Sequence, residues 1–169
     1  MENEQVGLLV IYYVDVEALN LTYWNPKYYR DCNATAKRFG RNDPIHYIHI
    51  HGETLVPLGN NVLVDVFVHE FLSNEYRRSF VEMHYKLCDL LLRDNVFGQY
   101  INKDLPKTCP IPKGVYHLTN MSIPDLPLLK TFPFQKGRVF AHTTIKREAG
   151  TRERLLDGYV DVVIKQRWR

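Results

Sequence analysis

The chain has 169 residues, of which 45% are hydrophobic and 24% charged, and its formal net charge is +3. This length fits one domain, residues 1–169, with a real core, and the composition excludes wholesale disorder. Apart from residues 165–169 the basic residues are scattered, so the concentrated basic face of a nucleic-acid-binding protein is missing. We expect a single globular domain that binds no nucleic acid.

The first residues carry no recognisable secretory signal. Residues 7–14 are apolar, but Glu2 and Glu4 stand where a signal carries positive charge, and the run is too short to cross a bilayer. The alternation over residues 13–17 predicts a strand instead, and we expect no transmembrane segment. A secreted form would have lost its signal or would begin upstream of Met1.

Period-two alternation predicts further strands over residues 45–51, 62–71, 74–83, 115–123, 137–146 and 155–168. The clearest is 62–71, in which Val62, Val64, Val66 and Val68 share one face. In the last strand Leu156, Val160, Val162 and Ile164 face one way, and Asp157, Asp161 and Lys165 face the other.

One helix is predicted from about residue 84 to about residue 94, because Leu87, Cys88, Leu91 and Leu92 recur at helical spacing. It could resume through Tyr100. Prolines between 106 and 112 end it, and Pro124, Pro127 and Pro133 predict an extended, irregular crossing. Helices do not alternate with the strands. We therefore predict a mainly β fold, an antiparallel immunoglobulin-like sandwich or cup with one short helix.

The histidines suggest a metal site. His49 and His51 are two apart, so on a strand they share a face, and a third ligand would have to come from Glu53, His69 or another strand. No further metal-ligand spacing is visible. Two exposed or hydrogen-bonded histidines are the commoner arrangement, and we expect no bound metal and no cofactor.

Catalytic patterns have little support. Ser73, Ser79 and Ser122 lie outside any nucleophile elbow. His84 and Cys88 are one helical turn apart, but a Cys–His pair would require Cys88 to be reduced. Asp157 and Asp161, four apart on a strand, are more typical of a solvent face than of an acid–base site. We expect no enzymatic activity.

The cysteines and glycosylation motifs bear on location. Cys32, Cys88 and Cys109 are an odd number, and in a cytosolic protein all three would be buried thiols. We expect Cys88 and Cys109 to pair, and closing a loop of that length would stabilise the fold by about 3 kcal/mol. Three N-x-[ST] motifs, at Asn20, Asn33 and Asn120, favour the secretory pathway.

A family resemblance begins in the segment Cys109-Pro110-Ile111-Pro112-Lys113-Gly114-Val115-Tyr116, which resembles the ganglioside-activator proteins. Residues 123–127 and 137–140 continue the likeness in order. Upstream, Glu75-Tyr76-Arg77, the helix at 87–91 and the strand at 62–68 resemble a large insect family of secreted proteins. That family has an uncharacterised domain related to the myeloid-differentiation-related lipid-recognition type. The likeness covers roughly residues 33–166.

The resemblance implies a β-cup, a secreted protein and binding of a lipid or other hydrophobic molecule, with a chemosensory role among some insect relatives. It also implies the Cys88–Cys109 bridge. Activator proteins have more disulfides than three cysteines permit, so the chain resembles the sparser insect branch.

Two functions follow as predictions. In the first, the chain carries a hydrophobic small molecule or lipid, presented to a cell-surface receptor, in a cavity lined by Val64, Val66, Phe140, Val160, Val162 and Ile164. In the second, it is an extracellular protein-recognition module with a filled core and an exposed apolar or aromatic patch.

Overall fold

Eight antiparallel strands and two short helices make up the fold in this computed structural model, which describes residues 10–95, 97–123 and 133–168. The elements follow in chain order: β1 (Val10–Trp24), β2 (Tyr29–Lys37), β3 (Tyr47–Thr54), β4 (Val62–Leu72), β5 (Glu75–Lys86), α1 (Leu87–Leu92), α2 (Gly98–Ile101), β6 (Gly114–Met121), β7 (Lys136–Lys146) and β8 (Arg152–Trp168).

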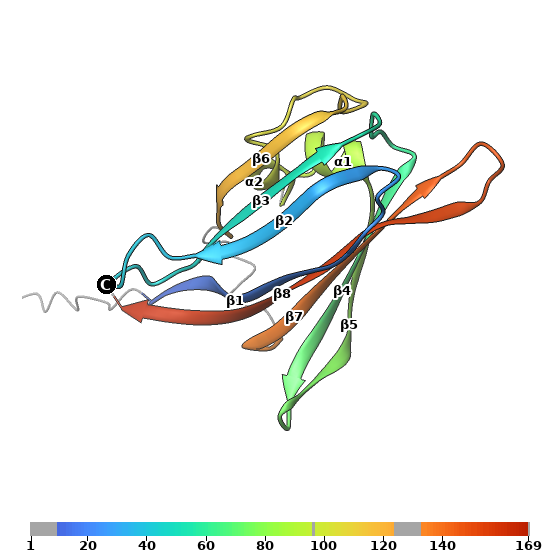
Figure 1. The fold of residues 1–169 in the computed structure, drawn as a ribbon. Coiled ribbons are helices and arrows are strands. Elements are labelled where there is room, and N and C mark those ends of the chain that lie inside the picture. The colour runs from blue at the N-terminus through green and yellow to red at the C-terminus, as the bar shows by residue number, and fades with distance from the viewer. Residues whose placement is uncertain (1–9, 96, 124–132, 169) are drawn as a thin grey trace, which may run out of the picture.

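The strands form two sheets that pack as a sandwich (Figure 1). The large sheet has the order β1-β8-β7-β4-β5, and the small sheet has the order β2-β3-β6. The chain passes directly from β1 in the large sheet to β2 in the small one, and α1 and α2 lie beside the small sheet. The β7–β8 hairpin projects past the rest of the large sheet. The predicted mainly β, antiparallel sandwich is confirmed.

Alternating valines explain why β4 lies inside the large sheet, between β7 and the edge strand β5. Val62, Val64 and Val68 are buried on one face, and branched side chains of this kind fit a pleated, packed surface. β4 pairs with β5 on one side and β7 on the other. The predicted strand at residues 62–71 is therefore confirmed almost to the residue.

Four features differ from the sequence prediction. β1 extends from Val10 to Trp24, well beyond residues 13–17, and β2 was not predicted. The expected helix begins only at Leu87, because strand alternation in β5 continues to Lys86. The expected resumption of the helix near Tyr100 is a separate helix, α2. The predicted irregular crossing at Pro124 and Pro127 lies outside the described residues.

The core consists of two clusters at opposite ends of the large sheet. The helix-end cluster contains Tyr28, Leu58, Val62, Ile145 and Leu155, with Leu155 at 0% exposure. The far-end cluster contains Val14, Val16 and Val162. Leu155 is more buried than the predicted Leu156, because the β7–β8 register shifts where Thr143 and Thr144 face Leu156 and Arg154. This bulge turns an additional side chain into the core.

Candidate functional site

The face of the large sheet that carries the far-end cluster is the candidate binding face. The β-ladder pairs Val66 with Ala141 and Ala141 with Gly158, and it pairs Val139 with both Val68 and Val160. Residues directly opposite in an antiparallel ladder have side chains on the same face. The strand registers therefore bring five of the six predicted pocket residues onto one face: Val64, Val66, Val160, Val162 and Ile164.

Burial varies across this inner face. Val64 is 7% exposed and Val162 is 8% exposed, so both are core residues. Val160 and Ile164 pack against the far-end cluster but are only partly buried, and Val66 is also partly buried. Ala36 of β2 and Ile48 of β3 contact the same cluster from the small sheet. The inner face is therefore covered only in part where these valines lie.

The middle of the inner face carries small side chains. One row across the sheet runs from Val66 on β4 through Ala141 on β7 to Gly158 on β8. A Cβ atom on Gly158 would come within 3.0 Å of the Asn20 carbonyl oxygen, so glycine here permits close approach of β1. Ala141 and Gly158 in this row have less side-chain volume than Val139 and Val160 in the next row.

Phe140 does not lie on this face. It pairs with Phe67 and Tyr159 in the ladder, and its ring centroid is 4.7 Å from that of His69. Val139 and Ala141, its neighbours along β7, are the residues that point inward. The predicted pocket is therefore corrected at this position: Phe140 belongs to the opposite, outer face of the large sheet.

The outer face is built from aromatic rings and charged groups. Arg138 donates two hydrogen bonds to Asp161, of 2.7 and 3.0 Å, and its guanidinium lies 4.0 Å from the Tyr159 ring centroid and 4.3 Å from that of Tyr76. Asp157 contacts Arg154 and lies 3.2 Å from His142 Nδ1. Asp161 and Asp157 were predicted to face solvent. They are only 8% and 5% exposed, because these arginine and histidine side chains cover them.

A buried carboxylate, that of Asp15, lies on β1 at the edge of the large sheet. Asp15, on β1, is 1% exposed; it accepts hydrogen bonds from the His46 backbone N–H and from Lys165 Nζ, and its Oδ1 is 3.0 Å from His46 Nδ1. Burial raises the pKa of Asp15, but the hydrogen bonds from His46 and Lys165 outweigh it and leave this pKa below its ordinary value. The contact fixes the end of the β2–β3 loop against β1.

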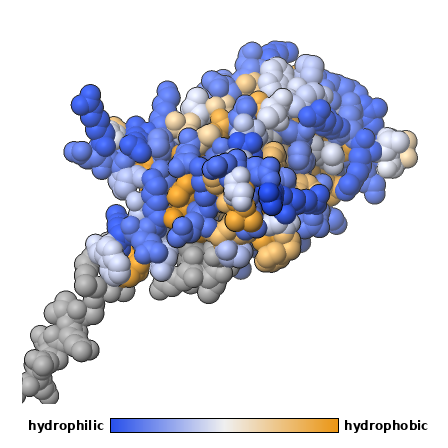
Figure 2. Space-filling view, turned by 90° about the horizontal axis from the view of Figure 1, so that it is seen from below, coloured by the Kyte–Doolittle hydropathy of each residue, from blue (hydrophilic) through white to orange (hydrophobic). Residues whose placement is uncertain are grey.

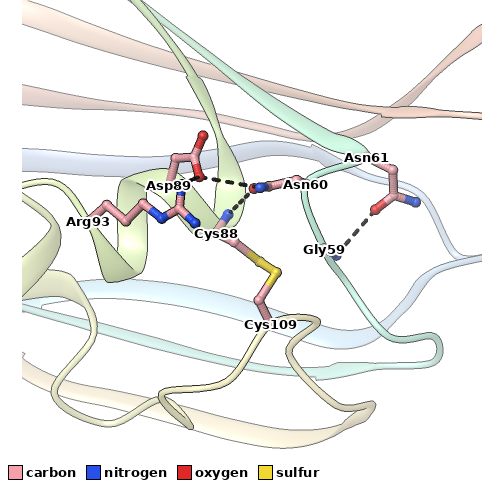
Figure 3. Close-up of a disulfide and its surroundings, with 7 residues drawn as sticks. All are labelled: Gly59, Asn60, Asn61, Cys88, Asp89, Arg93 and Cys109. Carbon is pink, nitrogen blue, oxygen red and sulfur yellow. Dashed lines mark hydrogen bonds and ion pairs between the residues drawn. A yellow bond between two sulfur atoms is a disulfide. The ribbon is translucent and has the colours of Figure 1, made fainter.

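The disulfide forms as predicted and joins the start of α1 to the loop before β6 (Figure 3). The Cys88 backbone N–H donates to Asn60 Oδ1 at 3.0 Å, and Asn60 Nδ2 donates to Asp89 at 3.3 Å. The bridge and Asn60 thus hold α1 against the loop that precedes β4. With its sulfur in the bond, Cys88 forms no Cys–His pair with His84, whose Nδ1 lies 2.6 Å from Asp65 instead.

The third cysteine and the asparagines of the three glycosylation motifs differ in their exposure. Cys32 is unpaired and partly buried, and burial, with a smaller effect from Asp31, raises the pKa of its thiol. The side chains of Asn20, Asn33 and Asn120 are all exposed. Attachment of a glycan requires such access.

The histidines are arranged differently from the prediction. His51 faces His117 on β6 with 2.8 Å between the two Nδ1 atoms, whereas His49 Nδ1 accepts the Asn120 backbone N–H at 3.3 Å. His69 lies on the large sheet, and Glu53 is 3.7 Å from Arg30. Within residues 10–95, 97–123 and 133–168, three or more His, Cys, Asp or Glu side chains do not gather around a possible metal position. His117 was not predicted, because its contact with His51 depends on the pairing of two strands whose histidines are 66 residues apart in the sequence.

Comparison with known proteins adds one match. Residues 62–140 match the family described as "Protein of unknown function (DUF1091)". That segment is similar to this family. It runs from the first residue of β4 into β7 and contains both bonded cysteines, but it is less than half of the chain. No curated protein matches the sequence. The relationship to lipid-recognition proteins stays a prediction.

The described part of the chain has no helix with both the length and the apolar character needed to cross a membrane.

Proposed function

We propose that this is a secreted, non-enzymatic protein that binds a lipid-like or other hydrophobic small molecule between its two sheets. The observation that carries the proposal is the inner face of the large sheet, where Val66, Val160 and Ile164 point inward yet stay partly exposed. A ligand that covered these side chains would gain roughly 25 cal/mol for each Å² of apolar surface removed from water.

The difference in sheet size supports a partly open inner face. The large sheet has five strands and the small sheet has three. A small sheet covers only part of a larger one, and the row Val66–Ala141–Gly158 has little side-chain volume of its own. A partly open face of apolar side chains is typical of proteins that hold an apolar ligand. Figure 2 shows the molecule from below the view of Figure 1, on the side of the large sheet that faces away from the small one, where orange apolar patches lie among blue polar residues.

Secretion and glycosylation belong to the same proposal. A disulfide is stable in an oxidising compartment, and Cys88–Cys109 anchors the helix end of the fold. Three exposed sequon asparagines, Asn20, Asn33 and Asn120, are consistent with passage through the secretory pathway. The family resemblance adds delivery of the ligand to a cell-surface receptor in chemosensation.

Native mass spectrometry of protein made in a secretory host tests the binding. We expect a co-purifying or exchangeable hydrophobic molecule at one per chain. Ala141→Phe fills the middle of the inner face and should abolish binding. His142→Phe is the matched control, since the same side chain then stands on the neighbouring residue, on the outer face. Failure of the parent to bind lipids or smaller apolar probes, or equal binding by both variants, would contradict the proposal.

A second function, a protein-recognition module, is favoured by Phe80. This residue of β5 is 84% exposed, and β5 is an edge strand of the large sheet. Aromatic residues of this exposure often anchor a protein partner. Phe80→Ala should weaken capture of such a partner on protein-binding arrays without changing hydrophobic-ligand binding. Loss of ligand binding in this variant would instead tie Phe80 to the first function.

A further inference from the structure

The outer face of the small sheet carries two histidines in direct contact. His51 on β3 and His117 on β6 are opposite each other in the ladder, and both are exposed to solvent or nearly so. Their Nδ1 atoms are 2.8 Å apart, and their ring centroids are 4.4 Å apart at an interplanar angle of 26°. Two nitrogens this close share one proton, since only one of them can donate to the other.

We propose that this histidine pair binds one divalent transition-metal ion with a square-planar preference, Cu²⁺ or Ni²⁺. When the ion binds, the shared proton leaves Nδ1 and the histidine that carried it takes up a proton on Nε2 instead, so that each imidazole stays neutral and supplies its Nδ1 as a ligand. Water or an external ligand completes the coordination, because the described residues place no third acidic, cysteine or histidine ligand at the pair. This site is on the opposite side of the small sheet from the proposed hydrophobic site and does not depend on it.

The distance between the two Nδ1 atoms, which their hydrogen bond already brings together, is compatible with a square-planar ion. With metal–nitrogen bonds of about 2.0 Å, neighbouring ligands of a square-planar ion lie about 2.8 Å apart, and those of a tetrahedral ion lie about 3.3 Å apart. The observed separation of 2.8 Å fits the square-planar case. A tetrahedral Zn²⁺ would have to push the two rings apart. Intrinsic affinities point the same way, since Cu²⁺ exceeds the other divalent ions of the first transition row.

The backbone holds the pair in place before the metal arrives. Gly52 pairs with Tyr116 and Ile50 pairs with Leu118, so the ladder is regular on both sides of His51 and His117. A preformed site avoids the entropic cost of bringing two ligands together. His49, two residues along β3, faces a register shift instead and accepts the Asn120 N–H, so it is not a member of the pair.

Asn33 is the neighbour that most affects the experiment. It lies opposite His51 on β2, on the same face of the sheet. A glycan on this asparagine would stand beside the metal site. Binding is therefore measured both on the glycosylated protein and on the Asn33→Gln variant.

Calorimetric titration with CuCl₂, followed by electron paramagnetic resonance, tests the proposal. We expect one Cu²⁺ per chain with nitrogen hyperfine structure from two imidazoles, and weaker binding of Zn²⁺. His51→Ala and His117→Ala should each lower Cu²⁺ affinity by about tenfold or more, a loss of about 1.4 kcal/mol. His49→Ala is the matched control and should bind as the parent does.

Three results would overturn the assignment. The first is Cu²⁺ affinity unchanged in both His51→Ala and His117→Ala. The second is a loss in His49→Ala as large as in those variants. The third is tighter binding of Zn²⁺ than of Cu²⁺ to the parent. Circular dichroism of each variant confirms that the exposed substitutions leave the sheets intact, so a loss of binding reports on the site.

Discussion

The two ends of the sandwich are built on different principles. At the helix end, Leu155 and Val62 are 0% and 1% exposed, and the Cys88–Cys109 bridge holds α1 in place. At the far end, Val14 and Val16 are buried, but Val160 and Ile164 around them are only partly covered. The same valine-rich strands serve both ends. The difference teaches that one sheet can be tightly packed at one end and only partly covered at the other, and the proposed ligand site depends on that second end.

Removing the bridge is expected to have the largest effect. The double variant Cys88→Ala/Cys109→Ala loses a cross-link between residues 21 apart in sequence, which should lower the free energy of unfolding by about 3 kcal/mol. Denaturant unfolding under non-reducing conditions measures this loss. Cys32→Ala is the control, because Cys32 is unpaired. A double variant as stable as this control would show that the helix end does not depend on the bridge.

A matched pair of valines compares the two ends directly. Val62 is 1% exposed in the helix-end cluster, and Val66, four residues along β4, is partly buried on the same face. Val62→Ala should cost about 2 kcal/mol, from two lost methyl groups and the cavity left behind, and Val66→Ala should cost less than about 1 kcal/mol. Urea unfolding measures both. Equal losses would mean that the inner face is packed uniformly and has no accessible end.

The strands predicted from the sequence are those in which the pattern of apolar side chains follows the two-residue period of a regular strand. β4 was found because valine recurs at every second position from Val62 to Val68, and β-branched residues at this period indicate a strand. β2 was missed because Asp31 has a φ of +53° and the register shifts between Arg30 and Asn33, so its exposed and covered positions do not alternate. A bulge is defined by how a strand pairs with its partner, so the composition of one segment does not predict it.

Five of the six residues expected to line the pocket lie on the inner face, and Phe140 does not. Val160, Val162 and Ile164 are two residues apart, and Asp161 and Lys165 occupy positions of the opposite face, which predicted that the three side chains share a face. Phe140 lies between Val139 and Ala141, so three consecutive residues of β7 are apolar. Their polarity alone does not show which of them point toward the small sheet. Only its pairing with Phe67 and Tyr159 places its ring on the outer face.

Acid should weaken the helix end through Glu153. The hydrogen bond from Tyr28 has the largest effect on Glu153, and together with Arg147 and Lys27 it outweighs desolvation and lowers the pKa of Glu153 from an ordinary value of 4.5 to about 2. Because the pKa is depressed in the folded state, this stabilisation is complete above pH 4.5 and is lost as the pH falls toward 2.

Glu153→Gln tests this dependence. Tyr28 belongs to the helix-end cluster, and its hydroxyl donates to Glu153 at 2.6 Å. The variant should therefore be less stable than the parent at pH 6, and the difference should shrink between pH 4.5 and 2, the range set by the two pKa values. Thermal unfolding at a series of pH values measures it. A constant difference over that range would show that ionised Glu153 contributes nothing specific.

The smallest expected effect is a difference in pKa between two histidines on the outer face of the large sheet, one toward each end. His84, nearer α1, has its pKa raised by hydrogen bonds to Asp65 and Glu82. His69, toward the other end of β4, has its pKa lowered by burial and by the positive charges of Arg78 and Arg138. Imidazole proton chemical shifts should therefore show His84 titrating at higher pH than His69. Asp65→Asn should lower the pKa of His84 and leave that of His69 unchanged, because Asp65 contacts only the former. If the two histidines titrate together in the parent, the charged groups of the outer face do not set their protonation.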